Sequence, residues 1–320
     1  MKFYYWDSVS QSASLDELRA KYRQVNESGF SGVFIGGVWQ DEFEIIKEFG
    51  LELHSWMWTV NRRDEKLLKE HPEWYQVSRS GKSCATDPPY VEYYRWLSPH
   101  VPGACDYILA QAKELSANPL IDGVHLDYVR FPDVILPRGL WENYGLVQDH
   151  EMADYDFCYS PLSLAAFEAE FGRNPLDQPD PSIDQDWLHF RFRAVNRLVA
   201  RIADQTRKDG KQITAAVFPT PRMARQICRQ DWDKWGLDIF CPMTYHNFYN
   251  EPISWIGERV RENIQAVNAP IVAGLHLPDL ESKESLREAV EAARSNGAAG
   301  VSFFGDRKPQ HFELVRELTN

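Results

Sequence analysis

Hydrophobic positions along the chain alternate between two spacings from one end to the other. Short apolar runs rich in β-branched and aromatic residues are followed by longer stretches in which apolar residues recur every three or four positions. The helical spacing is clear where Leu188, Phe192 and Val195 share one face, and again where Ile253, Ile256 and Val260 do. We expect strands in the short runs, which are residues 2–7, 31–37, 51–59, 122–131, 211–219, 237–246, 270–277 and 298–306.

This order of elements predicts a fold class. Several of the helical stretches end at a glycine just before the next strand, namely Gly29, Gly50, Gly210 and Gly297. Helical crossovers demand parallel strands, and eight such units in 320 residues favour an α/β protein of the (β/α)8 TIM-barrel class over an open sheet. No G-x-G-x-x-G follows a strand, which argues against dinucleotide binding. Without repeats or a linker, we expect one domain spanning residues 1–320.

Two connections are much longer than ordinary barrel loops. The first spans residues 60–103 after the third strand, and the second spans residues 133–186 after the fourth, with a short helix near 160–172. In a barrel both connections leave the C-terminal ends of neighbouring strands, where barrel enzymes build their active sites. We therefore expect an elaborated mouth around Asp127.

The net charge and composition of the chain argue against some classes of binding partner. A net charge of −12 argues against nucleic acid, because such partners need a concentration of Lys and Arg. No apolar run is long enough to span a membrane, and the first residues, MKFYYWDS, lack the features of a signal peptide. A location outside the cytoplasm stays open if a leader was removed.

The five cysteines lack C-x-x-C spacing and are expected to be buried thiols. Oligomeric state is not predicted.

The fourth predicted strand contains the run Asp122–Pro132, DGVHLDYVRFP, which places a histidine and a carboxylate on one face. Because side chains alternate along a strand, His125 and Asp127 would both point into the barrel, with Asp127 near the mouth and His125 one layer below. A strand can carry such groups when its upper end forms the floor of a site. The alternative is structural, either an ion pair between Asp127 and Arg130 or a histidine that only packs.

Polar or aromatic residues end several other predicted strands in the same layer. Each has a simple structural explanation, such as a hydrogen-bonded scaffold histidine or a core tryptophan, but their convergence favours a site. These residues are Asp7, His54, Trp56, Trp58, Tyr245, His276 and Asp306.

Several segments together resemble a known family. The stretches HPEWYQVSRSGK (71–82), RWLSPHVPGACDYILAQAKEL (95–115) and IDGVHLDYVRFP (121–132) are similar in order and spacing to glycosyl-hydrolase-like family ten, which is distinct from the family ten xylanases. GLELHSWMW (50–58) resembles that family's third strand, and LDIFCPMTYH (237–246) its sixth. The resemblance implies a barrel with glycoside hydrolase activity. It also implies a site lined by His54, Trp56, Asp127, Tyr128, Arg130 and Tyr245.

Glycosidic bond cleavage generally takes two carboxylates, and the separation between them decides retention or inversion. Asp127 is the first by position, either as an ionised nucleophile or as an acid with a raised pKa. No Glu ends any predicted strand, so Asp7 is the first choice for the second carboxylate, ahead of Asp306. The acidic run 149–156 is another candidate, although a solvated loop or a weak calcium site explains it equally well.

Three hypotheses follow. The first is a glycoside hydrolase that uses Asp127 and Asp7, needs no metal or other cofactor, and takes a carbohydrate substrate. The second is a carbohydrate-binding barrel that has lost its second carboxylate. The third, a metal-dependent hydrolase using His54, His125, Asp127 and His276, is disfavoured because the first strand lacks an H-x-H pair. The predicted substrate-binding residues are His54, Trp56, Trp58, His125, Tyr128, Arg130, Tyr245, His246, His276, Trp39 and Asp306.

Overall fold

A computed structural model describes residues 1–319 and shows a (β/α)8 barrel, as predicted. All paired strands are parallel, in the order β6-β5-β4-β3-β2-β1-β8-β7. Isolated parallel bridges from Phe240 to Ile271 and from Met243 to Gly274 join β6 to β7 and close the ring. The strands are β1 (Lys2–Ser8), β2 (Gly32–Gly36), β3 (Glu52–Trp58), β4 (Gly123–Asp127), β5 (Gln212–Val217), β6 (Ile239–Pro242), β7 (Val272–His276) and β8 (Gly300–Phe304).

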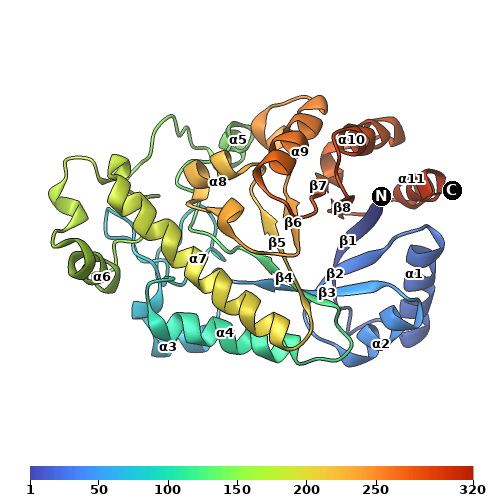
Figure 1. Ribbon diagram of the computed structural model, residues 1–320, viewed down its shortest axis with the longest axis horizontal. Coiled ribbons are helices and arrows are strands. Elements are labelled where there is room, and N and C mark those ends of the chain that lie inside the picture. The colour runs from blue at the N-terminus through green and yellow to red at the C-terminus, as the bar shows by residue number, and fades with distance from the viewer. Residues whose placement is uncertain (320) are drawn as a thin grey trace.

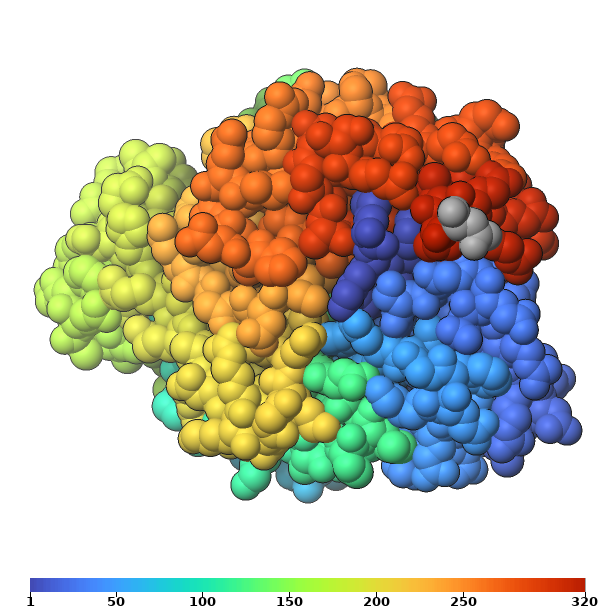
Figure 2. Space-filling view, turned by 45° about the vertical axis from the view of Figure 1, so that its right-hand side comes forward, coloured from blue at the N-terminus to red at the C-terminus, as the bar shows by residue number. Residues whose placement is uncertain are grey.

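Helices surround the strands (Figure 1). α1 and α11 lie side by side, so the two ends of the chain complete the helical ring (Figure 2). The helices are α1 (Leu15–Glu27), α2 (Gln40–Glu48), α3 (Glu65–Glu70), α4 (Pro102–Ser116), α5 (Trp141–Tyr144), α6 (Pro161–Phe171), α7 (Gln185–Lys208), α8 (Pro221–Cys228), α9 (Ser254–Ala266), α10 (Lys283–Ser295) and α11 (Pro309–Thr319). Short 3-10 helices in the loops include η2 (Arg138–Leu140) and η6 (His246–Tyr249).

The predicted helix ends are confirmed. After α1 and α7 the chain turns at Gly29 and Gly210, which have φ angles of 86° and 72°. Glycine adopts this left-handed conformation without the steric cost that a Cβ atom brings. At its other end, α1 begins with a capping box between Ser14 and Glu17.

Two apolar cores pack on opposite sides of the strands. On β1, Tyr4 and Trp6 point into the barrel, whereas Phe3 and Tyr5 face the helix layer. The same alternation sets the direction of the polar side chain near the end of β1. It places Asp7 on the helix side of β1, in phase with Tyr5.

The two long connections pack together beside the mouth. Antiparallel bridging of Ser78 with Phe157 joins the loop after β3 to the loop after β4. Within the second loop, α6 projects to one side of the barrel, at the left of Figure 1. A buried ion pair between Asp156 of this loop and Arg191 of α7, 2.6 Å apart, holds the loop against the barrel.

The cysteines and the apolar character of the helices were also addressed from the sequence. All five cysteines are free and buried, as expected. Among the described helices, none combines the length and the apolar character that crossing a membrane requires.

Candidate active site at the barrel mouth

Asp127 lies at the C-terminal end of β4 and its carboxylate is held by two hydrogen bonds. The Trp56 indole N–H donates to Oδ2 at 3.0 Å, and the backbone N–H of Tyr128 donates to Oδ1 at 2.7 Å. Burial raises the pKa of Asp127 to about 6, because the ionised form loses hydration; these hydrogen bonds and the charge of Arg130 offset part of the rise. Asp127 can therefore hold a proton in mildly acidic solution.

The backbone after Asp127 adopts an uncommon conformation. Tyr128 has a φ of 49°, in the left-handed region that bulky residues rarely occupy. The conformation is supported by aromatic packing, since the Tyr128 ring lies 4.8 Å from Trp58 and 5.6 Å from Trp96. The N–H of the same residue donates the hydrogen bond to the Asp127 carboxylate. Backbone strain of this kind concentrates at functional sites.

His125 and His54 lie beneath the site, inside the barrel. Both are fully buried. The His125 ring packs 4.2 Å from Phe34, and its Nδ1 lies 2.7 Å from the hydroxyl of Thr214. Burial lowers the pKa of His125 well below its usual value. His125 thus sits one layer below Asp127, as expected, and neither histidine lines the mouth cavity.

A cavity of about 180 Å³ opens above Asp127. Trp6 and Phe304 contribute from the strands, while the long loop after β4 supplies Tyr144 and the β6 loop supplies Tyr245 and Phe248. Tyr245 was predicted from the sequence, and it is only 7% exposed. The cavity therefore has mainly aromatic walls around the partly buried carboxyl group of Asp127.

A second carboxylate lines the same cavity, and it was not identified from the sequence. Asp133 is 5% exposed and its Oδ2 pairs with Nη1 of Arg130 at 3.0 Å. Burial alone would lower the pKa of Arg130, but the charge of Asp133 raises it overall, so the guanidinium stays charged. Among residues 1–319, Asp127 and Asp133 are the only carboxylates that line this cavity. Asp133 follows Arg130 by three residues in the sequence, but that spacing alone does not distinguish it from the other acidic residues of the loop.

Asp7 does not share the cavity with Asp127. Its carboxylate lies 2.5 Å from Nζ of Lys21 on α1 and 3.2 Å from Arg307, and it accepts a hydrogen bond from the Tyr5 hydroxyl. These cations hold the pKa of Asp7 below its usual value, although burial works in the opposite direction. The structure therefore corrects the expected pairing of Asp7 with Asp127 and shows Asp7 within an ion-pair network on the helix side.

Four further predicted residues do not line the mouth cavity. His276 pairs with Asp279 at 2.9 Å and lies behind Tyr245, with 5.3 Å between the ring centroids. His246 is buried in η6 outside the cavity wall. Two further predicted residues, Trp39 before α2 and Asp306 after β8, also lie off the cavity.

The acidic run 149–156 forms ion pairs. Glu151 pairs with Arg229, Asp154 with Lys82 at 3.0 Å, and Asp156 with Arg191. Across the described part of the chain, no three His, Cys, Asp or Glu side chains converge as metal ligands would. The run therefore anchors the long loop.

Solved structures of other proteins share the fold of this chain. No family model matches the sequence, and a search of curated proteins also finds no match. Among solved structures, the PgaB (BpsB) glycoside hydrolase domain from Bordetella bronchiseptica is similar over 99% of this chain and 98% of its own, with a TM-score of 0.73 and 14% identity. The fold is shared with glycoside hydrolase barrels.

Two further solved structures have a similar fold. The catalytic domain of β-amylase from Paenibacillus polymyxa matches with a TM-score of 0.66 and 13% identity, covering 100% of this chain and 98% of its own. A catalytic mutant of Gan42B, a GH42 β-galactosidase from G. stearothermophilus, matches with a TM-score of 0.60 and 12% identity, over 98% of this chain and 55% of its own. Identities this low establish the common barrel fold alone.

The hydrogen bond from Trp56 gives a first testable prediction. We expect Trp56→Phe to raise the pKa of Asp127 by about 0.5–1 unit, because the lost N–H stabilises the ionised carboxylate. The measurement is a ¹³C NMR titration of labelled aspartate carboxyl groups. Trp74→Phe is the matched control, since Trp74 stacks on His71 away from the mouth. A pKa that stays at the wild-type value in Trp56→Phe would contradict the assigned hydrogen bond.

Proposed function

We propose that the protein is a glycoside hydrolase whose active site is the cavity above Asp127. The observation that carries this proposal is the Asp127 carboxyl group, whose pKa burial raises to about 6, at the C-terminal end of a barrel strand between aromatic walls. Such a group is suited to general acid catalysis, because it holds a proton near neutral pH and can still release it. The shared fold with glycoside hydrolase barrels supports the assignment.

In this mechanism, the protonated carboxyl group of Asp127 donates its proton to the leaving glycosidic oxygen. Asp133 is the second carboxylate, and it either attacks the anomeric carbon or removes a proton from the attacking water. Arg130 interacts with both carboxylates: it forms an ion pair with Asp133, and its positive charge lowers the pKa of Asp127. The aromatic side chains that line the cavity, including Tyr245 and Phe248, offer faces against which a sugar ring can pack.

A resemblance to glycosyl-hydrolase-like family ten supports the same proposal at a finer level; it covers residues 50–58, 71–82, 95–115, 121–132 and 237–246. Of the site residues that this resemblance implies, Asp127, Tyr128, Arg130 and Tyr245 line the cavity. Trp56 contacts Asp127 directly, through the hydrogen bond to its carboxylate.

A carbohydrate-binding barrel without catalysis is the second candidate. The observation that favours it is the ion pair between Asp133 and Arg130, which engages the only available partner of Asp127 among the described residues. The two candidates share the aromatic cavity and differ only in turnover. Hydrolysis of any bound glycan would decide between them.

The raised pKa of Asp127 predicts how hydrolysis depends on pH. Because the protonated form donates the proton, kcat/KM should be highest below about pH 6 and fall about tenfold per unit above it. The measurement is the rate of reducing-sugar release between pH 4 and 9, at about half-unit steps, on the best substrate of an oligosaccharide panel. Activity that increases as the pH rises through this window would contradict the assignment of Asp127 as the acid.

A further inference from the structure

A second and larger cavity, of about 780 Å³, lies on the outer wall of the barrel. α2 packs against α1 and α4 packs against α7, and the cavity lies between α2 and α4 over part of β3. We call it the β3 groove; it runs from Ser8 and Gly36 at the strand ends, past Ser55, to Tyr107 and Gln111 on α4. Within residues 1–319, no residue lines both this groove and the mouth cavity.

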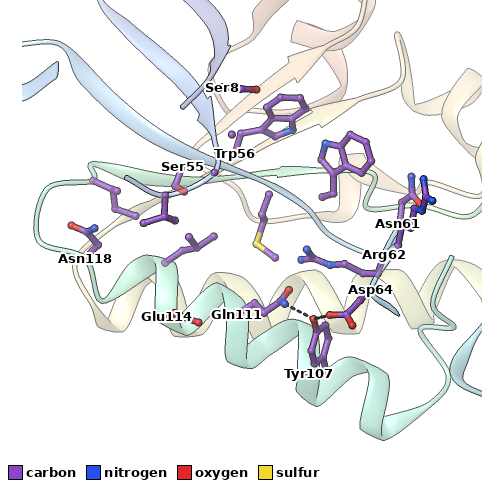
Figure 3. A pocket seen from close by; sticks show the side chains of 18 of the residues that line it. Ser8, Ser55, Trp56, Asn61, Arg62, Asp64, Tyr107, Gln111, Glu114 and Asn118 are labelled. Atoms are coloured by element: carbon purple, nitrogen blue, oxygen red, sulfur yellow. Dashed lines mark hydrogen bonds between the residues drawn. The ribbon is translucent and has the colours of Figure 1, made fainter. Parts of the chain in front are cut away.

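Arg62 supplies to the β3 groove a positive charge that has no direct ion pair among the described residues. Figure 3 shows its side chain extending into the space between β3 and α4. Its Nε donates to the backbone oxygen of Thr59 at 3.2 Å, whereas its Nη2 is shielded from water and has no hydrogen-bond partner in the described chain. Burial lowers the pKa of Arg62 to about 10. A guanidinium in such a setting favours a bound carboxylate.

The nearest carboxylate of the protein is already engaged. Asp64 Oδ1 caps α3 by accepting from the backbone N–H groups of Lys66 and Leu67, at 2.9 and 3.0 Å. Its Oδ2 accepts from the Tyr107 hydroxyl at 2.8 Å, and Tyr107 in turn accepts from Gln111 at 2.6 Å (Figure 3). Asp64 makes no direct ion pair with Arg62, although its charge raises the pKa of Arg62, so Nη2 of Arg62 remains without a hydrogen-bond acceptor from the described residues.

Further polar groups of the groove also have unused hydrogen-bonding capacity. Ser55 Oγ, Asn61 Nδ2 and Gln111 Oε1 are buried and have no partner in the part of the chain that the structure describes. Ser55 and Asn61 are each 1% exposed, and buried polar groups of this kind are normally paired. Trp58 and Tyr107 add aromatic faces to the same groove. The lining therefore suits a ligand with a carboxylate, several hydroxyls and a ring.

We propose that the β3 groove binds a uronic acid, with the sugar carboxylate at Arg62. Its hydroxyls would then bond to the amide and hydroxyl groups of Asn61, Gln111 and Ser55, and its ring would pack against the aromatic side chains. This groove shares no lining residue with the mouth cavity, although Trp56, which lines the groove, donates a hydrogen bond to Asp127 at the mouth. Binding in the groove does not depend on the proposed hydrolysis. The groove would hold a free acidic sugar or an acidic unit of a longer glycan by the same contacts.

Isothermal titration calorimetry with D-glucuronate tests this proposal on the whole protein. We expect saturable binding with a dissociation constant below about 10 mM, and binding of D-glucose at least about tenfold weaker because it lacks the carboxylate. Arg62→Gln should weaken glucuronate binding at least about tenfold. Arg261→Gln is the control, because it removes the same charge from an exposed position on α9 and should bind like the wild type.

Gln111→Leu keeps the test decisive if Arg62→Gln does not fold. It removes the unpartnered Oε1 acceptor, together with the hydrogen bond from Nε2 to Tyr107, and should weaken glucuronate binding about threefold or more. Absence of saturable glucuronate binding to the wild type would overturn the proposal. So would equal affinity for glucose, or wild-type affinity in folded Arg62→Gln and Gln111→Leu, since the sugar would then bind elsewhere. A glucuronate-containing oligosaccharide that binds more tightly than the free acid would identify a glycan as the ligand.

Discussion

Asp127→Asn should lower kcat by at least about 10³-fold while leaving glycan affinity within about threefold of the wild type. The amide keeps the shape of the side chain, so the cavity and its aromatic walls are retained. It cannot donate a proton to a leaving oxygen as a carboxylic acid does. The hydrogen bond from Tyr128 can still be accepted by the amide oxygen. The check is steady-state hydrolysis together with calorimetric titration of the same glycan.

The matched control is Asp106→Asn. Asp106 lies on α4, where its side chain is 67% exposed and pairs with Arg201, so its loss should change kcat by less than about twofold. If Asp127→Asn hydrolyses the glycan as fast as this control does, Asp127 takes no part in the chemistry.

The second large effect concerns stability. Arg191→Met should lower the free energy of unfolding by about 3–5 kcal/mol, because it leaves the Asp156 carboxylate buried without its main cation. Both side chains of this pair are fully buried, at 0% exposure. Urea denaturation followed by circular dichroism measures the change.

Arg193→Met is the control for this prediction. Arg193 stands on the same helix, α7, and pairs with Glu170 at the surface, where its side chain is 41% exposed. Exposed pairs contribute about 0–1 kcal/mol, so this variant should unfold close to the wild type. Equal losses in the two variants would mean that the buried pair does not anchor the loop.

The barrel was predictable because its strands and helices follow the two hydrophobic periods. The position of Asp127 followed from the same logic, since His125 and Asp127 are the polar members of one face of β4. Asp7 was harder to place for a physical reason: residues 3–6 of β1 are all aromatic. Without polar alternation, the sequence does not reveal which face of β1 points inward.

The second carboxylate, Asp133, could not be predicted from the sequence for a different reason. Asp133 belongs to a long loop, and its direction depends on tertiary contacts that no local period encodes. An ion pair with Arg130 holds the Asp133 side chain at the cavity, and the Tyr90 hydroxyl donates to the backbone oxygen of Asp133 at 2.7 Å. Residues 43 positions apart in sequence thus fix the loop beside the mouth. Spacing alone gave Asp133 no advantage over the other acidic residues of the loop.

We propose above that the mouth cavity cleaves glycosidic bonds. The most direct test of this proposal is the release of new reducing ends by the wild-type protein from a broad panel of oligosaccharides and polysaccharides, measured near pH 5, where Asp127 is mostly protonated. We expect new reducing ends from at least one glycan that the protein also binds. Saturable binding of a glycan at the mouth without any new reducing ends would contradict the proposal and favour the carbohydrate-binding barrel.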